Sequence, residues 1–267
     1  MHNIYSVFAD QDLSLHFPPN TLSLTYDDGP GPNTAAIADY LADNGIQATF
    51  FAVGDSIREN ESIVAHVAAR GHQIGNHTNH HPQLVEHMRD KPADVIAEVS
   101  EVHKLIQRFV GSGPYLFRPP YGQWSKEIAA PLNKDPILNN YIGPIGWDIE
   151  RGDYEIGDES THDPEHDVYT VESCCTKFVE RTREKGKGVV LLHDWCADPE
   201  PTRSKLRNRN QTLKLTQLLV PELKKHFKFI PLTEILKREI LIGRQSLMDD
   251  GSMKSDKRSE DFSTKGF

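Results

Sequence analysis

The sequence has few cysteines and no long apolar run, two features that would identify a disulfide-rich, zinc-finger or membrane protein. Only three cysteines occur in 267 residues, two of them adjacent (Cys174 and Cys175) and one distant (Cys196). This number and spacing fit neither a disulfide framework nor a zinc finger, so we expect free thiols. No run approaches the ~20 consecutive apolar residues that a membrane helix requires, so we expect no membrane partner.

A leader is also missing from the sequence as given. The first residues, MHNIYSVFADQDLSLHF, contain neither a basic region nor a continuous apolar stretch of the kind found in signal peptides. We therefore expect a cytoplasmic protein, or a secreted or periplasmic one if a leader has been removed.

Basic residues are in the minority. The net charge is −9, and residues 148–167 alone hold nine carboxylates and one arginine, a local charge of −8. Such an acidic segment argues against nucleic acid as a partner, because phosphate binding requires a basic face. The one basic cluster, at residues 203–209, is typical of a solvated face. The oligomeric state is not defined by these data.

Short apolar segments alternate with longer segments of helical periodicity. Predicted strands cover residues 21–27, 48–53, 72–76, 115–119, 141–148, 188–194 and 227–232. Predicted helices cover residues 33–45, 59–71, 92–111, 170–186 and 209–227, with Pro221 as a kink or a break and His103 at the surface. About seven strands separated by helices indicate an α/β fold with a parallel sheet, most simply a barrel.

The chain contains no internal repeat and no interdomain linker. We therefore predict one domain over residues 1–242. Residues 243–267 are polar and aperiodic, which is typical of a disordered tail.

Ionisable residues follow most of the predicted strands. Active-site residues of parallel α/β barrels gather where strands end, so these residues are expected to share one face. They are Asp27 and Asp28, His77, Arg118, Asp153 and His193.

Asp27 and Asp28 are neighbours at the end of the first strand. Successive side chains on a strand point to opposite sides, so one carboxylate could bind a metal while the other accepts a proton. The alternative is a simple turn, because Asp-Gly-Pro is a common turn sequence.

Four histidines fall within ten positions in GHQIGNHTNHHPQL. His77 and His81, or His77 and His80, have spacings that let two imidazoles meet one ion from a single helical turn. Two histidines and one carboxylate would leave open coordination positions, as in catalytic zinc sites. The alternative is a polar loop rich in histidine, and we expect His72 to be structural.

Two other positions allow two interpretations. Arg118 lies in the rigid segment FRPPYGQW, whose backbone N–H groups could form an oxyanion hole, but it could equally be a surface residue. His193 ends an apolar strand and could be structural. With Asp153 holding its ring it would be a competent general acid.

Together and in order, these segments resemble the NodB-type polysaccharide deacetylases, carbohydrate esterase family four. Five ordered motifs carry the resemblance over residues 21–194: TYDDGP, HTNHHP, RPPY, ERGDY and LLH. The resemblance implies an irregular (β/α) barrel, the NodB homology domain.

The same resemblance implies a role for each matching residue. Asp28, His77 and His81 would bind one divalent metal ion, zinc above all, with cobalt or nickel as substitutes. Asp27 would be the general base, oriented by Arg118, and His193 the general acid, tuned by Asp153. The remaining residues would form the substrate and oxyanion pocket: Tyr121, Leu191, Tyr154 and Trp147.

The implied activity is hydrolysis of a non-peptide carbon–nitrogen bond, which removes N-acetyl groups from N-acetylglucosamine units in chitin oligomers or peptidoglycan. Glu150 and Tyr154 depart from the fourth family motif, Asp-x-x-Asp-Trp, and the added hydroxyl of Tyr154 changes the shape and polarity of the pocket. An O-acetyl esterase acting on acetylated xylan or small aryl esters is therefore an alternative. A catalytically silent carbohydrate-binding module is a third.

Overall fold

The computed structural model describes residues 13–86, 94–111, 114–156, 169–195 and 211–236. The predicted tail at residues 243–267 lies outside the described residues, as do Cys196, the basic cluster at 203–209 and the acidic residues 157–168. Cys174 and Cys175 are free thiols, as expected, and both are buried.

Seven strands are described, and every pairing between them is parallel. They are β1 (Thr21–Asp27), β2 (Thr49–Ala52), β3 (Gln73–Asn76), β4 (Tyr115–Leu116), β5 (Tyr141–Ile142), β6 (Gly188–His193) and β7 (Lys228–Phe229). Each lies within a strand predicted from the sequence, so the alternation of apolar segments located all seven.

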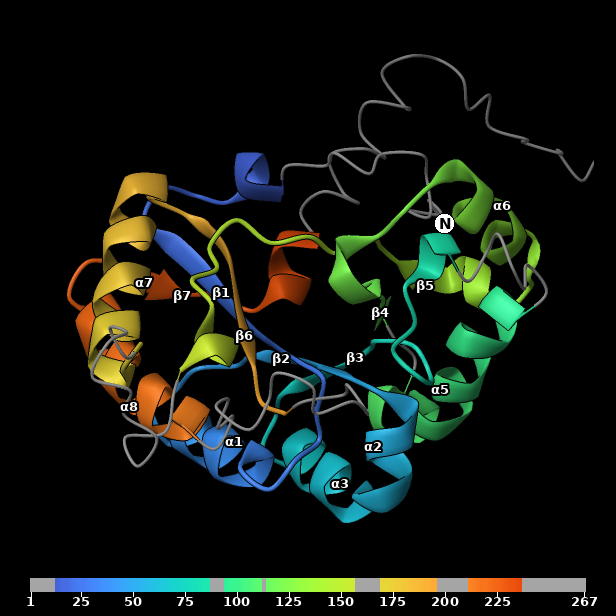
Figure 1. Cartoon of the computed structure of the whole chain (residues 1–267), viewed down its shortest axis with the longest axis horizontal. Helices are drawn as coiled ribbons and strands as arrows, with labels where there is room; N and C mark the ends of the chain where they lie inside the picture. Colours follow the sequence, from blue (N-terminus) through green and yellow to red (C-terminus); the bar gives the residue numbers. More distant parts are fainter. Residues whose placement is uncertain (1–12, 87–93, 112–113, 157–168, 196–210, 237–267) are drawn as a thin grey trace, which may run out of the picture.

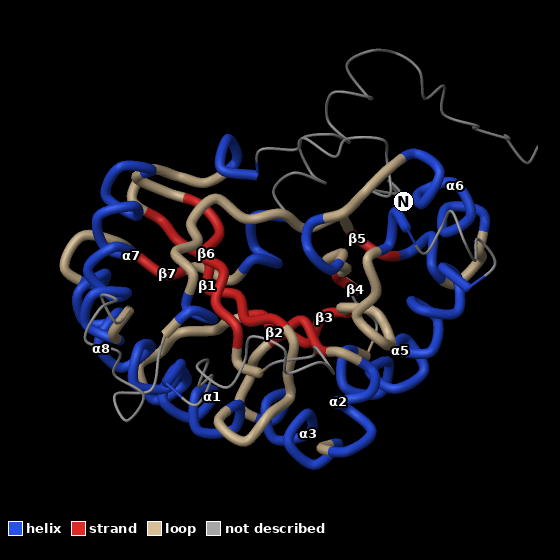
Figure 2. The backbone as a smooth tube through the Cα atoms, viewed as in Figure 1, coloured by secondary structure: helices blue, strands red, loops and turns tan. Residues whose placement is uncertain are grey.

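Helices surround these strands on three sides of the view in Figure 1, and Figure 2 shows the strands inside this arc. The α-helices are α1 (Thr34–Asp43), α2 (Gly54–Glu59), α3 (Glu61–Ala69), α5 (Asp94–Val110), α6 (Lys126–Lys134), α7 (Val171–Lys185) and α8 (Thr212–Lys224). Four short 3-10 turns are η1 (Leu13–His16), η2 (Pro120–Gly122), η3 (Leu138–Asn140) and η4 (Asp153–Glu155).

The strands form two sheets rather than a closed barrel. One sheet has the order β3-β2-β1-β6 with β7 also paired to β1, and β4 pairs with β5 in the second. The isolated bridge Asn76–Phe117 links β3 to the residue after β4, and the bridge Ile149–Val190 pairs β6 with the segment that follows β5. Among the described residues no continuous ladder closes the ring, so the fold is an irregular, open version of the predicted barrel.

Apolar side chains pack on both sides of the central strands. All seven residues of β1 are buried, as parallel central strands require. Leu24 and Tyr26 belong to an outer core that also contains Ile37 of α1 and Leu219 of α8. A second, inner cluster contains one residue from each of four strands: Phe51 of β2, Leu116 of β4, Ile142 of β5 and Val189 of β6. This double packing holds the carboxyl ends of the strands in fixed positions.

Three strands, β4, β5 and β7, are at least three residues shorter than predicted, and a proline follows each of them. Proline cannot donate a hydrogen bond to a neighbouring strand, so a ladder stops near it. Pro119 follows β4, Pro144 follows β5 and Pro231 follows β7.

The structure narrows one helix prediction and contradicts another. Pro221 lies inside the single helix α8, which excludes the predicted break and leaves the kink as a prediction. The carbonyl of Gln217, four residues earlier, accepts a hydrogen bond from the Tyr40 hydroxyl at 3.4 Å. His103 is buried rather than at the surface, and its Nδ1 lies 3.1 Å from the Tyr141 hydroxyl. The cause is helical spacing, because His103 follows buried Val99 by four positions on α5.

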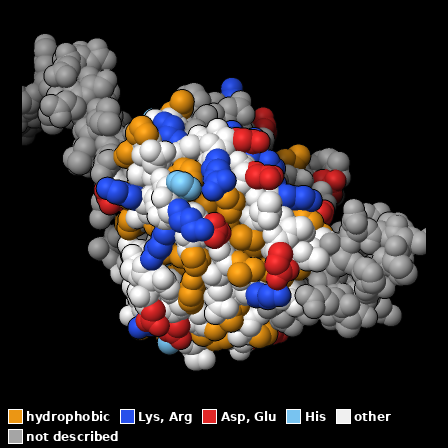
Figure 3. Space-filling view, turned by 90° about the vertical axis from the view of Figure 1, so that its left-hand side faces the viewer, with side chains coloured by type: hydrophobic (Ala, Val, Ile, Leu, Met, Phe, Trp, Pro, Cys, Tyr) orange, Lys and Arg blue, Asp and Glu red, His pale blue; other side chains and the backbone are white. Residues whose placement is uncertain are grey.

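No described helix has the length and apolar character needed to cross a membrane. Figure 3 shows the side of the molecule where α7 and α8 lie, with acidic, basic and apolar side chains interspersed. Ion pairs on these helices include Arg181–Glu184 and Lys225–Glu222. The charges on this face are therefore mixed.

Candidate active site and metal centre

Parallel pairing brings the carboxyl ends of β1, β2, β3 and β6 to one edge. In the register, Asp27 of β1 is opposite His193 of β6, and Ala52 of β2 is opposite Asn76, which directly precedes His77. A pocket of about 380 Å³ opens at this edge, which is within the usual range for small-ligand sites. It is lined by Asp27, Asp28, His77, His81, Tyr121, Trp147, Glu150, Tyr154, Leu191 and His193.

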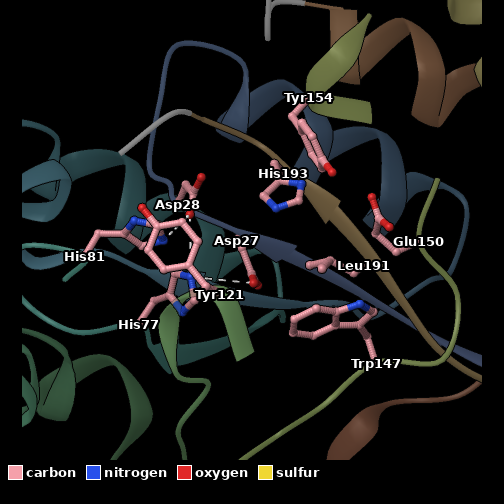
Figure 4. Close-up of a pocket in the computed structure, with 10 residues that line it drawn as sticks. All are labelled: Asp27, Asp28, His77, His81, Tyr121, Trp147, Glu150, Tyr154, Leu191 and His193. Atoms are coloured by element: carbon pink, nitrogen blue, oxygen red, sulfur yellow. Dashed lines mark ion pairs between the residues drawn. The ribbon is translucent and has the colours of Figure 1, made fainter. Parts of the chain in front are cut away.

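Asp28, His77 and His81 form a cluster on one side of this pocket (Figure 4). His81 Nε2 lies 3.2 Å and His77 Nε2 3.5 Å from Asp28 Oδ1, and ligand atoms of all three residues fall within 4.8 Å of one another. One carboxylate oxygen and two imidazole nitrogens are a donor set suited to zinc and similar divalent ions.

The orientation of His77 fits a metal ligand. Its Nδ1 lies 2.8 Å from the Arg118 carbonyl oxygen, which can only accept a hydrogen bond. Nδ1 therefore carries the proton, and Nε2 keeps its lone pair directed toward Asp28. This contact defines the tautomer that metal binding needs.

Backbone turns, rather than regular structure, present the three residues. Asp28 has a φ of 77°, so the chain leaves the extended conformation directly after β1. Asp27 and Asp28 therefore line the same pocket instead of pointing to opposite sides of a strand. His77 and His81 are not on one helical turn, because their loop contains positive φ angles at Thr78 (69°) and His81 (55°).

The other two histidines of the segment GHQIGNHTNHHPQL, His80 and His72, lie outside the cluster of Asp28, His77 and His81. The His80 side chain is 61% exposed, and its Nδ1 contacts Glu98 rather than the pocket. His72 is buried, where its ring contacts the backbone N–H of Ala48 and the carbonyl of Ala38. The geometry thus separates His77 and His81 from His80 and His72, as the sequence pattern indicated.

Arg118 is completely buried, which excludes the surface alternative. Its Nη1 donates to Asp27 Oδ1 at 2.7 Å and to the Thr25 hydroxyl at 2.9 Å. Its Nε and Nη2 donate to the carbonyls of Ile145 and Gly146. Arg118 therefore holds Asp27 in one orientation in the pocket.

His193 and Asp153 form a second pair across the pocket. His193 Nδ1 lies 2.9 Å from Asp153 Oδ1, and the backbone N–H of His193 donates to Asp153 Oδ2 at 2.7 Å. Asp153 belongs to η4 and is buried. The imidazole therefore turns its Nε2 away from Asp153, and Figure 4 shows the ring on the pocket wall opposite His81.

Buried charges shift the pKa values of two pocket residues. Burial lowers the pKa of His193, but the Asp153 carboxylate outweighs this effect and raises it to about 9. Burial opposes ionisation of Asp28, yet the neighbouring imidazoles of His77, His81 and His193 hold its pKa well below the usual range. At neutral pH His193 is thus protonated and Asp28 is ionised.

Aromatic side chains border the pocket on both sides. Tyr121 has a φ of 57° in η2, and its ring lies 4.7 Å from that of His81. The ring of Tyr154 meets that of His193 edge-on at 5.4 Å. Trp147 and Leu191 lie on the same side as His193 (Figure 4). All four pocket residues expected from the sequence are therefore present.

Three residues at the site were not predicted. Glu150 lines the pocket, and its Oε1 accepts the N–H of Gly152 at 2.6 Å. Asp194 is buried, and its carboxylate accepts hydrogen bonds from Thr34 and from the backbone of Gly29. Asp194 directly follows His193 in LLHD, which was a usable signal. Thr25 gave no signal in the sequence.

Comparisons with known proteins agree with this geometry. The family model described as polysaccharide deacetylase matches residues 15–137. The chain is 30% identical over 207 residues to a chitooligosaccharide deacetylase of Azorhizobium caulinodans, covering 76% of this chain and 88% of that enzyme. It is 26% identical over 229 residues to a peptidoglycan-N-acetylglucosamine deacetylase of Listeria monocytogenes, covering 84% of this chain but 40% of that enzyme.

Solved structures show the same fold. The chitin deacetylase of Colletotrichum lindemuthianum matches with a TM-score of 0.63 and 26% identity, covering 81% of this chain and 87% of the other. A family 4 carbohydrate esterase from Streptomyces lividans matches with a TM-score of 0.53 and 23% identity, covering 79% and 91% of the two chains. With the site and the sequence match in agreement, this chain belongs to the polysaccharide deacetylase family and is an enzyme of that family.

Proposed function

We propose that this protein removes N-acetyl groups from N-acetylglucosamine units of an oligo- or polysaccharide, by hydrolysis that depends on one divalent metal ion. The observation that carries the proposal is the arrangement of two buried pairs around one pocket. One pair, Asp27 and Arg118, lies beside the cluster of Asp28, His77 and His81. The other pair, His193 and Asp153, lies across the pocket from that cluster. The printed activities of the relatives, on chitin, chitooligosaccharides and peptidoglycan, support the same substrate class.

Asp28, His77 and His81 would hold the metal ion. When bound, a divalent cation such as zinc polarises the acetyl carbonyl and lowers the pKa of a coordinated water to about 7. We propose zinc, with cobalt or nickel as substitutes, because imidazole and carboxylate donors suit these ions.

Asp27 would be the general base. Asp27 is buried, and its Oδ1 accepts a hydrogen bond from Arg118 Nη1 at 2.7 Å. Its other oxygen, Oδ2, lies 3.6 Å from His77 Nε2 and therefore faces the proposed metal ligands. A carboxylate in this position can take the proton of the attacking water.

His193 would be the general acid. An amine leaves poorly from a tetrahedral intermediate unless it receives a proton, and His193 is protonated at neutral pH because of Asp153. The leaving sugar amine would receive this proton on the side of the pocket opposite Asp28.

The remaining lining residues would bind the substrate. The backbone N–H of Tyr121 would help to stabilise the oxyanion, and Leu191 would contact the acetyl methyl group. Trp147 and Tyr154 would contact the faces of the sugar rings, since aromatic rings supply a large apolar surface at the pocket wall.

Release of acetate from a chitin oligomer tests the proposal. The zinc-loaded chain is expected to release acetate, a chelator should stop the release, and added zinc should restore it. Parallel rates on acetylated xylan and an aryl acetate separate N-deacetylation from the O-acetyl esterase alternative. Acetate release from the two esters, but from no N-acetylated sugar, would replace this proposal with the esterase.

A further inference from the structure

The loop that carries both histidine ligands, residues 77–81, has no regular structure of its own. Thr78 and His81 have positive φ angles, a conformation that costs free energy for residues other than glycine. The loop must therefore be held by its surroundings if His77 and His81 are to stay at metal-binding distance.

The Glu98 side chain of α5 contacts this loop between the two ligands. Its Oε2 accepts hydrogen bonds from the backbone N–H groups of Asn79 and His80, both at 2.9 Å. Its Oε1 lies 2.8 Å from His80 Nδ1. Glu98 is only 6% exposed, so these hydrogen bonds form where water competes little.

The opposite side of the loop is held by α2. The N–H groups of Gly54 and Asp55 donate to the carbonyls of Thr78 and Asn79 at 3.0 and 3.1 Å. Arg58 Nη2 donates to Asn79 Oδ1 at 2.7 Å. The loop thus lies between two helices, and Glu98 is the contact from the α5 side that binds its backbone at two successive positions.

We propose that Glu98 is a positioning residue for the metal centre, which fixes the separation of His77 and His81 through the backbone of Asn79 and His80. This inference rests on the metal-site part of the proposed function and not on the identity of the sugar. Without an acceptor at Glu98, two backbone N–H groups at a largely buried position lose their partner, and the loop is expected to rearrange to reach water. Partners that orient metal ligands in this way typically change metal affinity by about 10- to 100-fold.

Three variants of the full chain test the proposal, with the zinc dissociation constant measured against a chromophoric chelator in the absence of sugar. Glu98→Leu removes the acceptor at similar volume and is expected to weaken zinc binding by about 10- to 100-fold. Glu98→Gln keeps one oxygen that can accept both N–H groups, so it should restore most of the affinity. Glu101→Leu, on the exposed side of the same helix, is the matched control and should bind zinc as the unaltered chain does.

Activity at rising zinc concentration separates positioning from a merely structural role. In the Glu98→Leu variant, kcat should recover as zinc is raised, because the ligands remain present. Unchanged zinc affinity in Glu98→Leu, or equal losses in Glu98→Leu and Glu98→Gln, would overturn the proposal. If the leucine variant does not fold, Glu98→Asp keeps the charge but retracts both oxygens, and unchanged affinity there would count equally against it. Because zinc binding is measured without substrate, failure to release acetate would refute the proposed activity and leave this test intact.

Discussion

Asp27 and His193 are register partners at the carboxyl ends of β1 and β6. Neighbouring strands lie about 4.8 Å apart, so the sheet itself places the proposed base and the proposed acid on adjacent positions of one pocket. Each is held by a buried partner on its far side, Asp27 by Arg118 and His193 by Asp153. The backbone pairing thus fixes their spacing, and the partners fix their orientation.

Replacing Asp153 should change the pH dependence of catalysis. The Asp153 carboxylate raises the pKa of His193 to about 9, and in the proposed mechanism the acid form of His193 is the active one. In Asp153→Asn this attraction is lost, so the pKa of His193 should fall. The alkaline limb of the pH profile, where activity declines, should therefore move to a lower pH. The measurement is kcat against pH with zinc present. An alkaline limb at the same pH in both proteins would contradict this role.

The two neighbouring histidines of the loop should respond differently to substitution. His81→Ala removes a proposed metal ligand, so zinc binding and activity should both be abolished. His80→Ala removes an exposed side chain and leaves the two backbone hydrogen bonds to Glu98, so most of both properties should remain. Zinc titration of the two variants decides the assignment. The reverse outcome would place the second ligand one residue earlier.

Removing the proposed acid should affect amides more than esters. In His193→Ala, acetate release from a chitin oligomer should fall by about 10²- to 10⁴-fold, the usual contribution of a general acid. An aryl acetate has a leaving group that departs without a proton, so its hydrolysis should fall far less. The ratio of the two rates is the measurement, and equal losses would show that His193 does not protonate the leaving group.

A methyl group at Gly29 should disturb the segment that follows Asp28. A Cβ on Gly29 would lie 2.1 Å from Asp194 Oδ2, while one on Gly146 would have no neighbour within 4 Å. Gly29→Ala should therefore lower the free energy of unfolding by about 1–3 kcal/mol and weaken zinc binding. Gly146→Ala is the control for thermal unfolding and zinc affinity. Equal behaviour of the two variants would show that the Asp194 contact does not hold this segment.

The sequence predicted the long strands best. β1 and β6 were located to within a residue, because fully buried parallel strands are continuous apolar, β-branched runs. α6, Lys126–Lys134, was not predicted, because Pro131 lies within it. The strands of the predicted barrel form two sheets, and prolines follow the three shortest strands.

The identities of the site residues could be predicted, but not the way the chain presents them. Motif order singled out His77 and His81, yet the positive φ angles at Thr78 and Asp28 have no marker in the sequence. The burial of Arg118 depends on Thr25 and on the carbonyls of Ile145 and Gly146, which are distant in sequence. Glu98 is one of several carboxylates in the sequence of α5, and only the fold places it against the loop.

The most direct test of the proposed mechanism compares Asp27→Asn with the unaltered chain on one chitin oligomer, with zinc affinity measured on the same samples. The account predicts that Asp27→Asn binds zinc as tightly as the unaltered chain, because Asp28 is the ligand, while its kcat for acetate release falls by about 10²- to 10⁴-fold. An Asp27→Asn variant that keeps its rate, or that loses zinc binding to the same degree as Asp28→Asn, would contradict the separation of base and ligand on which the account depends.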